Sequence, residues 1–138
     1  MMTGLLIVTH QNLGDALIDA AEFILGTRPE LLEAVSIDLN ENAENLRKKI
    51  ARGIQEVKTD HGVLILTDMF GGSPSNLSYS FLEEDAVEVL SGVNLPILIK
   101  ALKIRQDKSL ADIAVEVEDY GKKSISIASS ILKGNKRV

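Results

Sequence analysis

The chain has 138 residues, a formal net charge of −5 at pH 7, no cysteine and no tryptophan. The lack of cysteine excludes disulfides, thiolate nucleophiles and cysteine-ligated metals. An acidic chain with 4% aromatic residues also lacks the basic surface and stacking platforms that nucleic acids require. This length is typical of a single domain, which we expect to span residues 1–138 and to bury about two-thirds of its unfolded surface.

Short apolar runs alternate with amphipathic stretches along the chain, and this alternation is typical of a mostly parallel α/β sheet. In the first half the pattern predicts a strand at 4–9, a helix at 15–25, a strand around 35–39 and a helix at 42–57. In the second half it predicts a strand at 63–67, a helix at 74–82, a strand at 86–90 and helices at 96–104 and 109–120. Gly121 is the expected end of the last helix. The apolar segment 5–8 is too short to span a membrane and has no basic flank, so we expect a cytoplasmic protein.

The segment from Ser124 to Ser129 alternates polar and apolar residues, a period that predicts a final strand with one face in solvent. Such a strand has an open edge, which invites pairing with another strand. We expect the four preceding strands to form an open, doubly wound sheet in the order 2-1-3-4, with helices on both faces.

A buried strand followed by a glycine turn lies at the centre of the chain. The apolar run 63–66 is followed by Asp68, and the residues Gly-Gly-Ser-Pro at 71–74 suit a tight turn and the start of a helix. Backbone N–H groups at such a junction bind anions, including phosphoryl groups. The turn lacks the lysine of a nucleotide-binding P-loop, so another residue must bring the phosphate.

His10 is the candidate for that residue, because it follows the first strand as Asp68 follows the third. In the order 2-1-3-4 these two strands are neighbours, and ligand sites lie at the carboxyl ends of strands where the chain connections diverge. A carboxylate that accepts a hydrogen bond from one ring nitrogen leaves the other nitrogen available as a nucleophile. The sequence therefore predicts a histidine–aspartate pair beside an anion-binding turn.

Each of these residues also has a purely structural interpretation. His10 fits an ordinary loop residue, Asp68 a turn cap and Ser73 a plain helix N-cap. The other histidine, His61, lies in a loop with no carboxylate pattern around it, so a metal site built from several histidines is not expected. We expect neither a metal ion nor another cofactor.

Three separated motifs resemble a known protein family, the IIA domain of the mannose family of the bacterial phosphoenolpyruvate-dependent sugar phosphotransferase system. The motifs are Thr9-His10, Asp68-Met69-Phe70-Gly71-Gly72-Ser73-Pro74-Ser75-Asn76 and Gly92-Val93-Asn94-Leu95-Pro96-Ile97-Leu98. The resemblance covers essentially the whole chain. It implies a phosphohistidine carrier that takes part in sugar transport.

The resemblance also implies roles and partners. His10 would accept a phosphoryl group from the phosphocarrier protein HPr and pass it to a IIB component, while Asp68 would orient His10 and Ser73 would bind the phosphoryl oxygens together with the Gly71-Gly72 turn. The family implies a homodimer that exchanges the last strand as an antiparallel edge, and contact with the membrane only through transporter subunits. Because the chain ends at Val138 without a fused IIB domain, we expect the acceptor to be a separate protein.

Other functions fit part of the same pattern. The phosphotransferase subunit of dihydroxyacetone kinases carries a similar IIA domain with a different acceptor, and a regulatory phosphoprotein would keep the same residues. In a receiver-like module with a similar sheet, Asp68 rather than His10 would be phosphorylated. For the carrier, Met69 and Phe70 are the candidates for exposed apolar residues that contact HPr.

Overall fold

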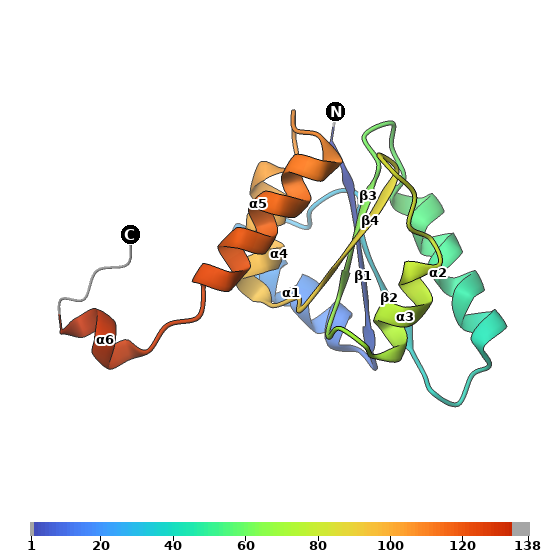
Figure 1. Ribbon diagram of the computed structural model, residues 1–138, viewed down its shortest axis with the longest axis horizontal. Helices are drawn as coiled ribbons and strands as arrows, with labels where there is room; N and C mark the ends of the chain where they lie inside the picture. The colour runs from blue at the N-terminus through green and yellow to red at the C-terminus, as the bar shows by residue number, and fades with distance from the viewer. Residues whose placement is uncertain (1, 134–138) are drawn as a thin grey trace.

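The computed structural model describes residues 2–133, in which strands and helices alternate along most of the chain (Figure 1). The strands are β1 (Gly4–His10), β2 (Leu32–Ile37), β3 (Val63–Thr67) and β4 (Val87–Ser91). The helices are α1 (Leu13–Leu25), α2 (Ala43–Val57), α3 (Ser73–Tyr79), α4 (Leu95–Ile104), α5 (Leu110–Lys123) and α6 (Ala128–Leu132). Up to α5 this is the order of elements that the sequence predicts.

The four strands form one parallel sheet in the order β2-β1-β3-β4, which confirms the predicted topology. The central strands β1 and β3 have nearly uninterrupted apolar sequences, as burial on both faces requires. The chain leaves β1 toward β2 and leaves β3 toward β4, in opposite directions across the sheet. The carboxyl ends of β1 and β3 therefore border the point where these connections diverge.

Helices cover both faces of the sheet (Figure 1). Leu5 and Ile7 of β1 pack in one core with α1, α4 and α5, whereas Leu6 and Val8 pack in a second core with α2 and part of α3. Alternate residues of a strand face opposite sides, and His10 follows Leu6 and Val8 with the same period of two. The histidine therefore lies on the α3 side of the sheet.

Short polar side chains fix where several helices begin. Side-chain oxygens at the N-termini of α2, α4 and α5 accept hydrogen bonds from N–H groups three residues later; the capping residues are Asn42, Asn94 and Ser109. Helix α1 begins at Leu13, two residues earlier than predicted, because Oγ1 of Thr9 accepts a hydrogen bond of 2.9 Å from the N–H of Gly14. The residue before His10 thus holds the start of the following helix.

Gly121 does not end α5, contrary to the sequence prediction, and the helix continues to Lys123. Gly121 is buried, and a β-carbon at this position would lie 2.7 Å from two side-chain carbons of Ile97 in α4. The glycine therefore allows close approach of α5 to α4. A glycine needed for packing and a glycine needed for a left-handed turn look alike in a sequence.

The strand predicted from Ser124 to Ser129 is wrong for this chain on its own. Residues 125–127 have no regular structure, α6 begins at Ala128, and the exposed segment leads away from the sheet (Figure 1). A strand needs a hydrogen-bonded neighbour, and within residues 2–133 this segment pairs with no strand of the sheet. The alternation of polar and apolar residues favours an extended chain but does not provide a strand with which it can pair.

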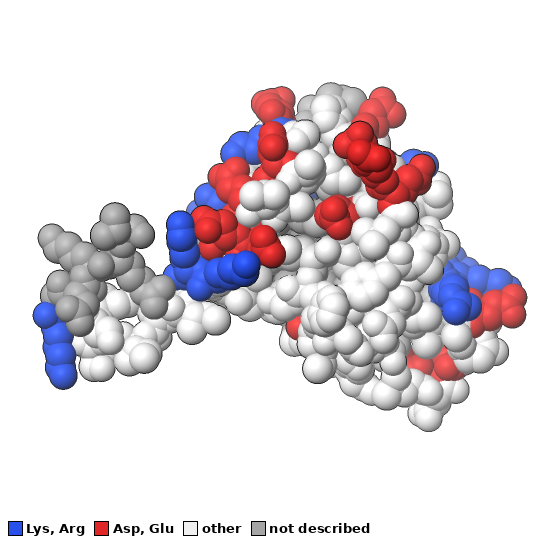
Figure 2. All heavy atoms as spheres, viewed as in Figure 1, with Lys and Arg blue, Asp and Glu red and all other residues white. Residues whose placement is uncertain are grey.

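Charged side chains are unevenly distributed over the surface (Figure 2). In this view they gather over α5, over α2 and at the upper edge of the molecule, whereas the face over α3 is largely free of Lys, Arg, Asp and Glu, which agrees with the uncharged sequence SPSNLSY of this helix. Among residues 2–133, none of the helices combines the length and the apolar character needed to span a membrane.

Candidate functional site

His10 and Asp68 meet at the carboxyl end of the sheet, where β1 and β3 lie side by side. His10 is the last residue of β1, and Asp68 directly follows β3. One carboxylate oxygen of Asp68, Oδ2, lies 2.8 Å from Nδ1 of His10 and 2.9 Å from its backbone nitrogen. His61 precedes β3 and therefore lies toward the opposite end of the sheet.

Two opposing effects act on the carboxyl group of Asp68. Burial alone would raise its pKa, but hydrogen bonds from the backbone and ring of His10, with the attraction of the ring, hold that pKa below its ordinary value. The carboxylate is therefore ionised at neutral pH and can only accept hydrogen bonds. It follows that Nδ1 of His10 has the hydrogen in this bond, and in the neutral ring the lone pair is then on Nε2.

The glycine turn after β3 uses its two glycines for different purposes. Gly71 has a φ of 84°, a conformation that L side chains rarely adopt, and open space surrounds the position of its missing β-carbon. Gly72 has an ordinary φ but packs against the ring of His10 and the side chain of Met69. Gly71 therefore sets the course of the backbone, and Gly72 allows the backbone to approach the histidine.

Ser73 is the first residue of α3, with Gly72 at the N-cap position before it. Pro74 follows in the first turn, where its missing N–H removes no helical hydrogen bond. The first turn of a helix leaves backbone N–H groups without partners inside the helix. The predicted sequence of strand, glycine turn and helix start is thus present at the end of the sheet that carries His10.

A cluster of hydroxyl groups beneath the turn was not predicted from the sequence. Ser75 of α3 is fully buried, and its hydroxyl group donates a hydrogen bond of 2.6 Å to the backbone carbonyl of Met69. Thr67 and Ser91 are paired across β3 and β4, and both contact the Ser75 hydroxyl. The signal in the sequence that could have indicated this cluster is a hydroxyl residue at the last position of each of two neighbouring strands.

Two large apolar side chains of the turn face solvent, as the sequence predicts. Met69 is 56% exposed and Phe70 is 80% exposed. The ring of Phe70 contacts that of Tyr79 in α3, with 5.9 Å between the ring centroids. Exposed apolar side chains next to a polar site are typical of surfaces that bind other proteins.

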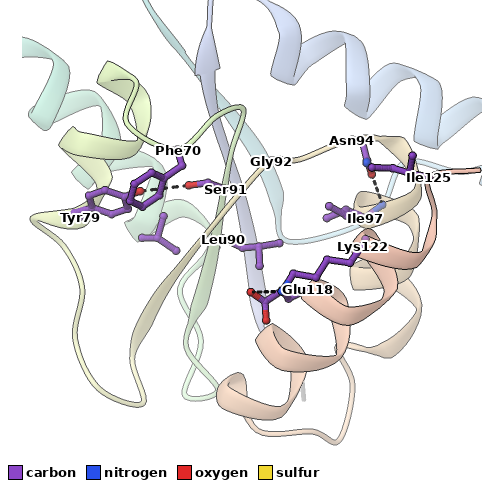
Figure 3. Close-up of a pocket in the computed structure, with 12 residues that line it drawn as sticks. Phe70, Tyr79, Leu90, Ser91, Gly92, Asn94, Ile97, Glu118, Lys122 and Ile125 are labelled. Atoms are coloured by element: carbon purple, nitrogen blue, oxygen red, sulfur yellow. Dashed lines mark hydrogen bonds and ion pairs between the residues drawn. The ribbon is translucent and has the colours of Figure 1, made fainter.

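A groove of about 480 Å³ runs along the outer edge of β4 (Figure 3). Phe70 and Tyr79 form one side, and Glu118, Lys122 and Ile125 form the other. In the described part of the chain β4 has only β3 as a sheet neighbour, and its five residues are only partly buried. The groove therefore exposes a strand edge that reaches the glycine turn at Phe70, although His10 and Asp68 do not line it.

Residues 4–118 match the family described as PTS system fructose IIA component, where PTS stands for the phosphotransferase system. The chain belongs to this EIIA family. It is 31% identical over 133 residues to the PTS system fructose-specific EIIA component of Bacillus subtilis (strain 168), which covers 96% of this chain and 90% of that protein. It is 34% identical over 130 residues to the PTS system mannose-specific EIIAB component of Escherichia coli (strain K12), which covers 91% of this chain but 40% of that protein.

The fold of this EIIA chain also agrees with a solved structure of the family. The phosphotransferase system component EIIA from Streptococcus agalactiae superimposes with a TM-score of 0.83 and 26% sequence identity, over 94% of this chain and 99% of that one. Family membership gives the chain a general phosphotransfer role in a sugar phosphotransferase system. The pair of His10 and Asp68 lies within the matched residues, whereas α6 lies outside them.

Proposed function

We propose that this EIIA chain is a phosphohistidine carrier that accepts a phosphoryl group from HPr on Nε2 of His10 and donates it to a IIB component. The observation that carries the proposal is the hydrogen bond of 2.8 Å between Nδ1 of His10 and Oδ2 of Asp68. It holds the ring hydrogen on Nδ1, so Nε2 keeps the lone pair that attacks phosphorus. The ring is also 35% exposed, which leaves it accessible to a partner.

In the proposed step, the bond between phosphorus and the donor nitrogen of HPr breaks as a bond between phosphorus and Nε2 of His10 forms. The donor nitrogen keeps the electron pair of the broken bond, and the His10 ring, which retains its hydrogen on Nδ1, gains positive charge. The carboxylate of Asp68 stabilises that charge. Transfer to a IIB component is the same exchange, with Nε2 as the leaving nitrogen.

The glycine turn supplies the groups that face the phosphoryl oxygens in this proposal. Phosphoryl transfer passes through a loose transition state, so an aligned nucleophile and well-placed hydrogen-bond donors are the main requirements. We assign the donors to the backbone N–H groups of Gly71 and Gly72 and to Ser73. Their position in the turn next to His10 and at the start of α3 supports this assignment.

The contacts of Asp68 favour His10 over Asp68 as the acceptor. Oδ2 of Asp68 is engaged by two groups of His10, and Oδ1 accepts a hydrogen bond of 3.0 Å from the N–H of Met69. The side chain of Asp68 is 12% exposed, about a third of the value for His10. Phosphorylation of Asp68 in a receiver-like module would require these bonds to break, whereas Nε2 of His10 needs no such change.

HPr and the IIB component are proposed to dock in turn over the same face. Met69 and Phe70 provide exposed apolar contacts beside the ring. The neighbouring surface over α3 is almost free of charge (Figure 2). Such a surface loses little hydration when a partner covers it.

We also propose a homodimer in which the segment from Ser124 to Ser129 pairs with β4 of a second copy. Val87 of β4 bridges to Glu83, but the rest of the outer edge of β4 has no strand partner among residues 2–133, and this edge and the groove along it fit an extended segment (Figure 3). Ile125 and Ile127 are 72% and 68% exposed in the single chain, and such a strand would bury them. The alternating sequence would then form the antiparallel edge strand that this chain alone does not form.

Phosphoryl labelling tests the carrier function. The chain is incubated with labelled phosphoenolpyruvate, the general phosphotransferase enzyme and HPr, and we expect one label on each chain. His10→Ala should remove the label and keep the fold, whereas the matched variant His61→Ala should label as the unchanged chain does. Full labelling of the His10 variant contradicts the proposal.

The identity of the acceptor is tested on the chain labelled in this way. A IIB component should remove the label rapidly if the chain serves sugar transport, whereas a dihydroxyacetone kinase should remove it if the chain is that kinase's phosphotransferase subunit. A label that neither removes would point to a regulatory phosphoprotein.

A further inference from the structure

The structure holds three hydroxyl groups against one another beneath the glycine turn. Oγ1 of Thr67 lies 2.5 Å from Oγ of Ser75 and 2.9 Å from Oγ of Ser91, and the two serine oxygens are 3.1 Å apart. These residues come from β3, α3 and β4 respectively. Thr67 and Ser75 are fully buried, so the cluster lies between the sheet and the helix rather than at the surface.

The role of Ser75 follows from a count of hydrogens, because each hydroxyl group has one. The carbonyl oxygen of Met69 can only accept, so the hydrogen of Ser75 is directed at Met69 over 2.6 Å. Because its own hydrogen is used there, the Ser75 hydroxyl group can only accept in its contacts with Thr67 and Ser91. The bonds then run in one direction, from the sheet through Ser75 to the backbone of the turn.

Met69 is the residue through which this chain of bonds reaches the site. Its N–H donates to Oδ1 of Asp68 at 3.0 Å, while its carbonyl accepts from Ser75. Its side chain packs beside Gly72, which in turn contacts the ring of His10. The backbone of Met69 therefore lies between the buried hydroxyl groups and the carboxylate that orients the histidine.

We propose that Ser75 is a positioning residue that fixes the carbonyl of Met69 and thereby holds Asp68 and Gly72 in place around the ring of His10. The effect of Ser75 on the rate of phosphoryl transfer rests on the proposed phosphocarrier function. Its effect on the geometry of the pair of His10 and Asp68 is independent of that function. A displacement of about 1 Å at a reacting group can slow a reaction by about a hundredfold, so a fixed turn matters for transfer.

Ser78 provides a matched control on the same helix. Like Ser75 it is fully buried, and its hydroxyl group donates to a backbone carbonyl over 2.6 Å. That carbonyl belongs to Pro74, one turn earlier in α3, so the bond stays within the helix. Ser75→Ala and Ser78→Ala therefore each remove one buried hydroxyl bond, but only the first loses the contact with the turn.

The experiment measures three quantities in the unchanged chain and in both variants. Urea unfolding gives stability, the nitrogen chemical shifts of the His10 ring give the fraction of rings with hydrogen on Nδ1, and single-turnover labelling from phosphorylated HPr gives the transfer rate. We expect Ser75→Ala to lower the Nδ1–H fraction, so that the two ring nitrogen shifts converge, and to slow transfer about ten- to a hundredfold. Ser78→Ala should change stability only.

The outcomes separate the two proposals. If Ser75→Ala folds and keeps the ring shifts of the unchanged chain, the positioning role is wrong, whatever the labelling shows. If Ser75→Ala is too unstable to measure, Thr67→Val, which removes the hydroxyl group nearest to that of Ser75, must shift the ring signals, and unchanged signals again contradict the role. If the unchanged chain takes no label while the ring shifts respond to Ser75→Ala, the carrier function fails and the positioning role stands.

Discussion

The β-carbon that Gly72 lacks would lie 3.1 Å from Cε1 of His10, so a methyl group at this position would fit only if the ring shifted by a few tenths of an ångström. We expect Gly72→Ala to displace the ring and slow phosphoryl transfer about tenfold, because the nucleophile loses its alignment. Stopped-flow or rapid-quench labelling from phosphorylated HPr measures this rate. Equal rates for Gly72→Ala and the unchanged chain would show that the contact has no role in transfer.

Gly71 is the matched control for that experiment, since open space surrounds the position of its β-carbon. Its φ of 84° makes Gly71→Ala costly by about 1 kcal/mol in the free energy of unfolding, and Gly71→Asn should recover part of that loss because Asn tolerates the left-handed region. The loss would arise from the backbone, not from contact with His10.

Asp68 should make the free energy of unfolding of the chain depend on pH in the acid range. The folded chain holds the pKa of Asp68 below its ordinary value, so the stabilisation by its carboxylate is complete above that ordinary value, about pH 4, and is lost as pH falls through the lowered pKa. Urea unfolding between pH 3 and pH 7 should show a smaller loss of stability in acid for Asp68→Asn than for the unchanged chain. Parallel pH profiles for the two proteins would contradict this expectation.

We expect Arg105 to contribute to the stability of the fold and not to phosphoryl transfer. It is 4% exposed, and its guanidinium group donates to the backbone carbonyls of Leu31 at 3.0 Å and of Glu30, near the amino end of β2. Arg105→Met leaves these carbonyls without their donor and should lower the free energy of unfolding by about 3 kcal/mol. The exposed cation Lys103 on α4 gives the control Lys103→Met, for which urea unfolding should show almost no change.

The dimer proposed here depends on the segment that follows α5. A chain that ends at Lys123 keeps the sheet and both cores but lacks the segment that would pair with β4 of the second copy. Sedimentation velocity should therefore give a dimer for the full chain and a monomer for the shortened one. A shortened chain that sediments as a stable dimer would count against strand exchange.

The sheet and the meeting of His10 with Asp68 could be predicted because they follow from short-range patterns. Apolar runs mark the buried strands, and a parallel sheet places the residues after neighbouring strands together. The helical role of Gly121 could not be predicted, since it depends on Ile97 in another helix. The hydrogen bond from Ser75 to Met69 likewise depends on how α3 packs against the sheet.

The prediction of a strand from Ser124 to Ser129 was wrong for a different physical reason. Alternating side chains favour an extended conformation, but a strand also needs backbone partners, and the sequence does not state where those partners lie. Within residues 2–133 the only open strand edge beside the end of α5 is that of β4, which borders the groove lined by Ile125.

The chemical stability of the phosphoryl label tests the central claim most directly. A phosphoryl group on Nε2 of His10 should be lost in acid, because protonation of the ring makes it a good leaving group, and should survive alkali. An acyl phosphate on Asp68 would instead be cleaved by alkali. We expect an acid-labile, alkali-stable label that is absent from His10→Ala; an alkali-labile label that persists in His10→Ala and disappears in Asp68→Asn would contradict the account.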